Sequence, residues 1–114
     1  MKRFLFSLLI FLTVQAVFAQ QNISVDCTAG PVSSSYCYGN GDTTQFEYVS
    51  SEGSPLNLTI DSGLIEAGWD IIRIIDSDGS VLFEGDNGGD LTGLYFQSSG
   101  DTITLGFQTD GSVD

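Results

Sequence analysis

The sequence predicts an all-β protein with the architecture of an antiparallel β-sandwich. After residue 19, helical periodicity is nearly absent, and short runs of alternating, β-branched or aromatic residues take its place. Each run is bounded by Gly, Asp, Asn or Ser turn signals. The chain also opens with an export signal, and short strands at this spacing in a small exported domain are typical of a sandwich.

Residues 1–19 have the pattern of a secretory signal peptide. Lys2 and Arg3 precede an apolar run over residues 4–12 that is interrupted only by Ser7, and Val17 and Ala19 suit a cleavage site after residue 19. The apolar run is too short for a transmembrane helix of about 20 residues. We therefore expect a secreted or surface-displayed chain whose mature part, residues 20–114, is one small domain that does not span a membrane.

Six strands are expected in the mature chain. They cover residues 45–49, 56–60, 70–76, 80–84, 91–97 and 102–108. Period-2 alternation should direct one set of side chains toward the core, namely Phe46, Tyr48, Leu56, Leu58, Ile60, Val81, Phe83, Leu94, Phe96, Ile103, Leu105 and Phe107. The segment "DSDG" at residues 76–79 is expected to be a tight hairpin turn.

The run "IIRII" at residues 71–75 is apolar on both parities apart from Arg73, as expected of a central strand covered on most of both faces. Arg73 should lie at an edge of that cover and pair with a carboxylate. No apolar strand follows "TDGSV" near the end of the sequence. We therefore expect a sandwich that lacks its closing strand and exposes an unpaired edge, in a sequence that is a fragment of a longer protein.

The charge of the mature chain excludes some classes of partner. Arg73 is its only basic residue against all fifteen Asp and Glu, which gives a formal charge of −14. Such a surface repels nucleic acid and anionic lipid. Because the carboxylates are dispersed among large apolar residues, we expect a folded domain that tolerates or neutralises them, and clustered carboxylates suggest a cation.

Cys27 and Cys37 are the only cysteines of the chain. In an exported protein, a disulfide that closes this short loop is the expected arrangement. Two cysteines without any histidine cannot complete a zinc site, so metal-bound thiols are the weaker interpretation.

The residue inventory argues against an enzyme. The chain has no His and the mature part no Lys, which excludes Ser-His, Cys-His and Ser-Lys nucleophile pairs. The turn Asp61-Ser62-Gly63 has the form of an aspartic protease turn, but nothing downstream supplies the apolar segment that braces one. Glu66 and Asp70 would need a sugar-binding cleft to act as a glycosidase pair, and a domain of this size offers little room for it.

A metal site assembled from separate loops fits the carboxylates better. Glu66 and Asp70 precede the central strand, and Asp110 follows the last one. Carboxylates and main-chain carbonyls of adjoining loops are the ligands that calcium prefers. The segment "DSDG" is not an EF-hand, because Gly at the sixth loop position and Glu at the twelfth are missing. The alternative is that all three carboxylates are solvated turn residues on an acidic surface.

The combination of "SGLIEAGWD" before a strand with "FQTDGSV" about 40 residues later resembles a CUB domain. The likeness is strongest to CUB-like modules of exported or surface proteins of Bacteroidetes-type bacteria, and it covers most of residues 27–114, including the opening "YCYGNGD". It implies a CUB-like jelly roll over residues 20–114 and a calcium ion. The ligands that it implies are Glu66, Asp70, Asp110 and the carbonyl of Ser112.

The chain departs from the CUB pattern in several ways. Trp69 stands where the family usually has Tyr, and its ring is expected to pack beneath the loop. The spacing of four residues between Glu66 and Asp70 is shorter than in many animal domains. The disulfide pattern differs as well, and the last strand is missing.

These observations favour a non-catalytic extracellular module for calcium-dependent binding or adhesion, which contacts protein or carbohydrate. In CUB domains that bind partners through the ion site, a basic side chain of the partner approaches the calcium-held carboxylates, and a charge of −14 suits such a partner. The alternative function is a structural spacer, or an accessory module of a larger exported protein or enzyme, with no ligand of its own.

Overall fold

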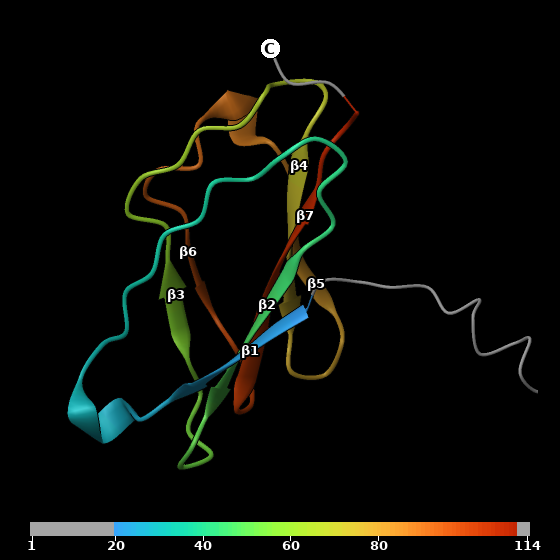
Figure 1. Ribbon diagram of the computed structural model, residues 1–114. Coiled ribbons are helices and arrows are strands. Elements are labelled where there is room, and N and C mark those ends of the chain that lie inside the picture. Colours follow the sequence, from blue (N-terminus) through green and yellow to red (C-terminus); the bar gives the residue numbers. More distant parts are fainter. Residues whose placement is uncertain (1–19, 112–114) are drawn as a thin grey trace, which may run out of the picture.

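A computed structural model describes residues 20–111 and confirms the all-β, sandwich-like fold (Figure 1). The predicted signal peptide, residues 1–19, lies outside the described residues. The helical elements assigned within residues 20–111 are two short 3₁₀ segments, η1 (Cys27–Ala29) and η2 (Asn87–Gly89). No helix in this part of the chain combines the length and the apolar character that crossing a bilayer requires.

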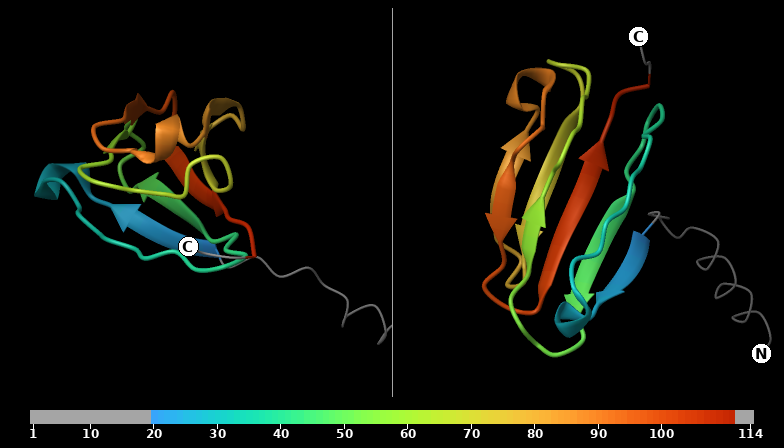
Figure 2. Two further views of the ribbon diagram at one scale, coloured as in Figure 1. Left: turned by 90° about the horizontal axis from the view of Figure 1, so that it is seen from above. Right: turned by 90° about the vertical axis from the view of Figure 1, so that its left-hand side faces the viewer.

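Five strands form one large sheet, seen side by side in Figure 2. Its order is β1 (Gln20–Val25), β2 (Gln45–Ser50), β7 (Thr102–Gln108), β4 (Ile71–Asp76) and β5 (Val81–Gly85). All neighbours are antiparallel except β1 and β2, which run parallel with Gln20 opposite Gln45. The sequence predicted a wholly antiparallel arrangement, but this sheet is mixed.

A small sheet of two strands, β3 (Asn57–Thr59) and β6 (Tyr95–Gln97), faces the large sheet and forms the second layer. Both strands are shorter than predicted. The beginning of the predicted strand 91–97 instead forms a turn, in which Gly93 N donates to the carbonyl of Ile60 at 2.7 Å and Leu94 N donates to that of Leu91 at 3.2 Å.

The core lies between the two layers. Its buried members are Leu56, Ile65, Ile72, Ile74, Leu91 and Ile103. Most of the other side chains predicted to point inward pack against this cluster and are partly buried: Tyr48, Leu58, Ile60, Phe83, Leu94, Phe96, Leu105 and Phe107. Phe46 is half-buried and packs edge-on against Tyr36.

Val81 is an exception, because its side chain is 52% exposed rather than inward. Ile74 lies opposite Phe83, but the next residue of β4, Ile75, lies opposite Val81. This shift inserts an extra residue, Leu82, into β5. A bulge of this kind reverses the alternation of side chains beyond it, which explains why Val81 leaves the core. The hairpin predicted at "DSDG" is confirmed, with Asp76 N donating to the carbonyl of Ser80 at 2.8 Å.

Arg73 pairs with a carboxylate, as predicted. It lies opposite Glu84 in the β4–β5 ladder, and the two side chains form a salt bridge. Both side chains are substantially exposed, so we expect this pair to contribute little to stability.

The predicted disulfide between Cys27 and Cys37 is wrong, because both thiols are free and exposed. Cys27 Sγ lies 3.9 Å from Ser50 Oγ at the end of β2, whereas the neighbours of Cys37 pack near Phe46 at its start. A strand rises about 13 Å over these four residues. Disulfide-bonded residues have Cα atoms only about 4.4–6.8 Å apart, so the two cysteines are too far from each other to form a bond.

Replacing Ile72 by Ala should destabilise the protein far more than the same change at Ile75. Ile72 is fully buried between the sheets, and its truncation should cost about 2–5 kcal/mol of unfolding free energy. Ile75 is on the same strand but only partly buried, so its loss should be much smaller. Urea unfolding of the two variants measures the difference, and equal losses would contradict this placement of the core.

Both thiols of the folded protein should react with a chromogenic disulfide reagent without denaturant. Exposed Cys27 and Cys37 predict two equivalents of reacted thiol per chain, and Cys27→Ser should lower this to one. Reduction should leave the melting temperature unchanged. Protection of both thiols until reductant is added would instead restore the disulfide interpretation.

Candidate metal centre

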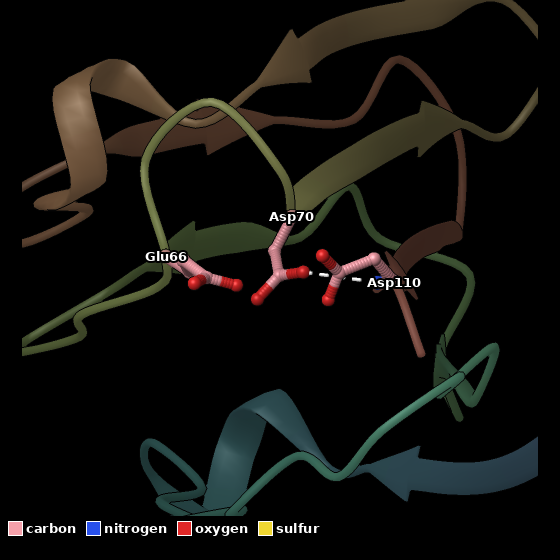
Figure 3. Close-up of side chains that lie close together, drawn as sticks. All are labelled: Glu66, Asp70 and Asp110. Carbon is pink, nitrogen blue, oxygen red and sulfur yellow. Dashed lines mark hydrogen bonds between the residues drawn. The ribbon is translucent and has the colours of Figure 1, made fainter. Parts of the chain in front are cut away.

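The three carboxylates that the sequence singles out come together at one end of the large sheet (Figure 3). One carboxylate oxygen from each of Glu66, Asp70 and Asp110 lies within 4.8 Å of the others. The Asp70 carboxylate is placed between those of Glu66 and Asp110. The predicted fourth ligand, the carbonyl of Ser112, lies outside the described residues.

The pairing of β4 with β7 brings Asp70 and Asp110 together. Ile71 lies opposite Gln108 at the end of this antiparallel ladder, so the residues just beyond it emerge side by side. The backbone N–H of Asp110 donates to Oδ1 of Asp70 at 3.0 Å. Two residues that are 40 positions apart in the chain are thereby held at hydrogen-bond distance.

Glu66 reaches the same place through a single helical turn. Its carbonyl accepts hydrogen bonds from Asp70 N at 3.0 Å and Trp69 N at 3.3 Å. Residues four apart on a helical turn share a face. The short spacing from Glu66 to Asp70, which departs from the CUB pattern, therefore brings the two carboxylates together rather than separating them.

The loop that carries Glu66 is tied to the segment around η2. Ile65 N donates to the carbonyl of Gly89 at 2.9 Å, and Gly68 N donates to Oδ2 of Asp86 at 2.6 Å. Gly68 has φ of +86°, a conformation that side chains disfavour. These contacts hold the loop in place before any ligand binds.

Tyr38, on the irregular segment between η1 and β2, supports the site, and the sequence analysis gave it no role. Its hydroxyl accepts a hydrogen bond from Glu66 N at 3.1 Å. The pKa of this hydroxyl is raised, first by burial and then by its interaction with the Asp70 carboxylate. Tyr38 belongs to the segment "YCYGNGD", but no feature of that segment's sequence indicated that Tyr38 would contact the Glu66 loop.

Asp42 is a second supporting residue that the sequence did not reveal. Its carbonyl accepts from Thr109 N at 3.1 Å, and its own N–H donates to Thr109 Oγ1 at 2.6 Å. The loop 39–44 is thus fastened to the residue before Asp110. Gly41 N also donates to the Asp110 carbonyl at 2.6 Å.

Asp70 is the most constrained member of the cluster. It is fully buried, and its Oδ2 atom accepts no hydrogen bond within residues 20–111. A buried polar atom without such a bond costs about 1–3 kcal/mol. Like charges at 4.8 Å add repulsion of roughly 3 kcal/mol per pair at an effective dielectric constant of about 20. The arrangement is therefore unfavourable when all three carboxylates are ionised with nothing between them.

The geometry of the cluster suits a hard divalent cation. Calcium binds oxygen ligands at about 2.3–2.6 Å, so two ligands on opposite sides of the ion lie about 4.6–5.2 Å apart. One oxygen from each of the three carboxylates lies within 4.8 Å of the others, so the three are close enough to bind one such ion. Every donor is a carboxylate oxygen, which favours calcium or magnesium over zinc or copper.

Trp69 does not lie where the sequence placed it. Its side chain is 67% exposed rather than packed beneath the loop, and Leu64 on the same loop is 75% exposed. The helical turn explains why the prediction for Trp69 is wrong. It directs the side chains of Glu66 and Asp70 inward, and it leaves Trp69, the residue before Asp70, on the outside. Two large apolar side chains therefore stand on the loop that carries the site.

Comparison of the sequence with models of known families and with curated proteins finds no match to either.

Lowering the pH should destabilise the loop around Asp42. Burial raises the pKa of Asp42, but hydrogen bonds from Tyr36, Thr44 and Gly39 outweigh it and lower the pKa from 3.8 to about 2. A depressed carboxyl pKa stabilises the folded state above the unfolded pKa, and that stability is lost as the pH falls from about 4 through about 2. Tyr36→Phe should therefore show a smaller loss of unfolding free energy over this interval than the wild type.

Urea unfolding at several pH values, followed by circular dichroism, provides the measurement. Tyr95→Phe, which changes an exposed tyrosine on β6, is the control and should follow the wild type. Parallel acid profiles for wild type and Tyr36→Phe would show that the Tyr36 bond does not lower the pKa of Asp42.

Proposed function

We propose that this protein is a non-catalytic, exported module that binds calcium through Glu66, Asp70 and Asp110 and contacts a protein or carbohydrate partner with the loop around that ion. The observation that carries the proposal is Asp70. Its carboxylate is fully buried between two others, and Oδ2 accepts no hydrogen bond in the described part of the chain.

A divalent cation would remove the cause of instability at this site. It would compensate the repulsion among the three carboxylates and give Asp70 Oδ2 a partner. Solvated turn residues, the alternative interpretation, would not require a fully buried carboxylate. The burial of Asp70 therefore favours a bound ion over a merely acidic surface.

Calcium is a better candidate than magnesium. Magnesium usually keeps several waters and binds one or two protein carboxylates, whereas calcium takes six to eight oxygens from flexible loops. Three carboxylates, main-chain oxygens and water supply such a set. The resemblance to CUB domains supports the same choice, since the ligands it implies fall on Glu66, Asp70 and Asp110, with the Ser112 carbonyl as a fourth.

The partner surface that we propose is the loop that carries the ion ligands. Trp69 and Leu64 expose most of their side chains on it. An exposed indole offers a flat apolar face to a sugar ring or a partner side chain, and its N–H adds a hydrogen-bond donor. The mature charge of −14 suits a partner that brings a basic group to the carboxylates.

Calcium should raise the melting temperature of the wild type, and Asp70→Asn should abolish the effect. Extracellular modules bind calcium with dissociation constants of about 10⁻⁴ to 10⁻³ M. At 100 times the dissociation constant, binding adds about 2.7 kcal/mol. For a domain of this size, that corresponds to a rise on the order of 10 °C.

The melting temperatures measured in chelator provide a second, independent expectation. Asp70→Asn removes a charge from the cluster, so without calcium the variant should melt at or above the wild type, and with calcium below it. Asp101→Asn makes the same charge change before β7, at the opposite end of that strand from Asp110, and should respond to calcium as the wild type does. Equal melting of the wild type with calcium and with chelator would instead favour a structural spacer without a ligand.

A further inference from the structure

An apolar groove runs along the inner face of the large sheet, on the side of β3 away from β6. Its volume is about 880 Å³. The floor consists of alternate residues of the large sheet: Ile23, Val25, Phe46, Tyr48, Ile72, Ile103, Leu105 and Phe107. Several of these are only partly buried although they point into the sandwich. The two strands of the small sheet therefore cover only part of the width of the five-stranded sheet.

One wall of the groove is an unpaired strand edge. Within residues 20–111, β3 pairs only with β6. The carbonyl of Leu56 and the N–H of Ile60 bond toward β6, each at 2.9 Å. Backbone groups alternate in direction along a strand, so those of Asn57 and Thr59 point to the opposite edge. Both residues line the groove.

The other wall is also extended backbone without pairing. Residues 30–36 all line the groove. This segment leads upward from η1 in Figure 1. Within the described chain, residues 31–35 make no backbone hydrogen bond to other backbone groups. The groove therefore lies between two stretches of chain whose backbone groups are open to pairing.

Charge marks the two ends of the groove. No Lys or Arg among residues 20–111 lines it, and the only basic residue of the mature chain, Arg73, is paired with Glu84. Asp61 lines the groove toward the carboxylate cluster. At the other end, Cys27 lines the groove and its N–H donates to Glu52 at 3.2 Å. Both ends are thus acidic, while the middle is apolar.

We propose that this groove accepts a β-strand from a partner polypeptide, by addition to the free edge of β3. The strand would pair with the backbone of Asn57 and Thr59 and lay alternate apolar side chains on the floor. Basic residues at its two ends would meet the acidic ends of the groove. A small apolar ligand fits less well, because it would leave the backbone groups of β3 without hydrogen bonds.

The length of the strand follows from the floor. The lining residues of β7 span five positions, from Ile103 to Phe107, and those of β2 span three, from Phe46 to Tyr48. At about 3.3 Å per residue, the segment needs roughly five to seven extended residues.

The test uses the chain without its predicted signal peptide and a fluorescent peptide of sequence KTVTVTVTVK. Anisotropy should show saturable binding, and the peptide should raise the melting temperature. A peptide with Glu at both ends should bind at least tenfold more weakly. A third peptide, with Pro in place of the second Val, should not bind, because Pro lacks the N–H that pairs with an edge.

Variants of β3 locate the binding edge. Asn57→Pro removes an outward N–H at the first residue of the strand, where Pro is tolerated, and should weaken binding at least tenfold. Asn57→Ala keeps that N–H and should bind as the wild type does. If Asn57→Pro does not fold, the three peptides with the wild type still decide the matter.

Three results would overturn the proposal. One is failure of the alternating peptide to bind, and another is equal binding of the Pro-interrupted peptide. The third is a dimer in light scattering that dissociates when Asn57→Pro is introduced, because a second copy would then be the natural occupant of the groove.

Discussion

The structure depends on the antiparallel pairing of β4 with β7. One register, from Ile71 opposite Gln108 to Asp76 opposite Ile103, decides both the core and the site. Within the ladder it directs Ile72, Ile74 and Ile103 into the space between the sheets, where all three are buried. Beyond the end of the ladder it delivers Asp70 and Asp110 to the same point. A shift by one residue would exchange the two faces of β4 and separate the carboxylates.

This dependence explains how a costly group of charges can persist. The buried core of the two strands fixes the backbone on either side of Asp70, and the Asp110 amide already bonds to Oδ1. The loop around Glu66 is tied separately to η2 and to Tyr38. Moving any one carboxylate away would break backbone hydrogen bonds or disturb the core. Packing and backbone hydrogen bonds therefore keep the three carboxylates together despite their repulsion. An ion that binds between them does not first have to order the loops.

Alternation and turn signals were sufficient to predict six of the seven strands and the meeting of Glu66, Asp70 and Asp110. They failed where tertiary context decides. β1 reads "QQNISV" and is mostly exposed, so no apolar pattern distinguishes it, and its parallel pairing has no local signal. The bulge that exposes Val81 depends on the pairing partner. The two cysteines are close in sequence, but an extended segment carries them to opposite ends of β2. The roles of Tyr38 and Asp42 arise from contacts between distant segments.

The carboxylate site and the groove share Tyr38. Its ring lines the groove and lies 6.0 Å, centroid to centroid, from the ring of Phe107 on the floor, while its hydroxyl accepts the Glu66 amide. A strand that fills the groove would press on one side of this ring, and an ion would order the loop bonded to the other. Under the two proposals, whichever ligand binds first restricts the same side chain and so reduces the entropy lost by the second. Linkage makes such an effect reciprocal, so calcium would strengthen strand binding by the same factor by which the strand strengthens calcium binding.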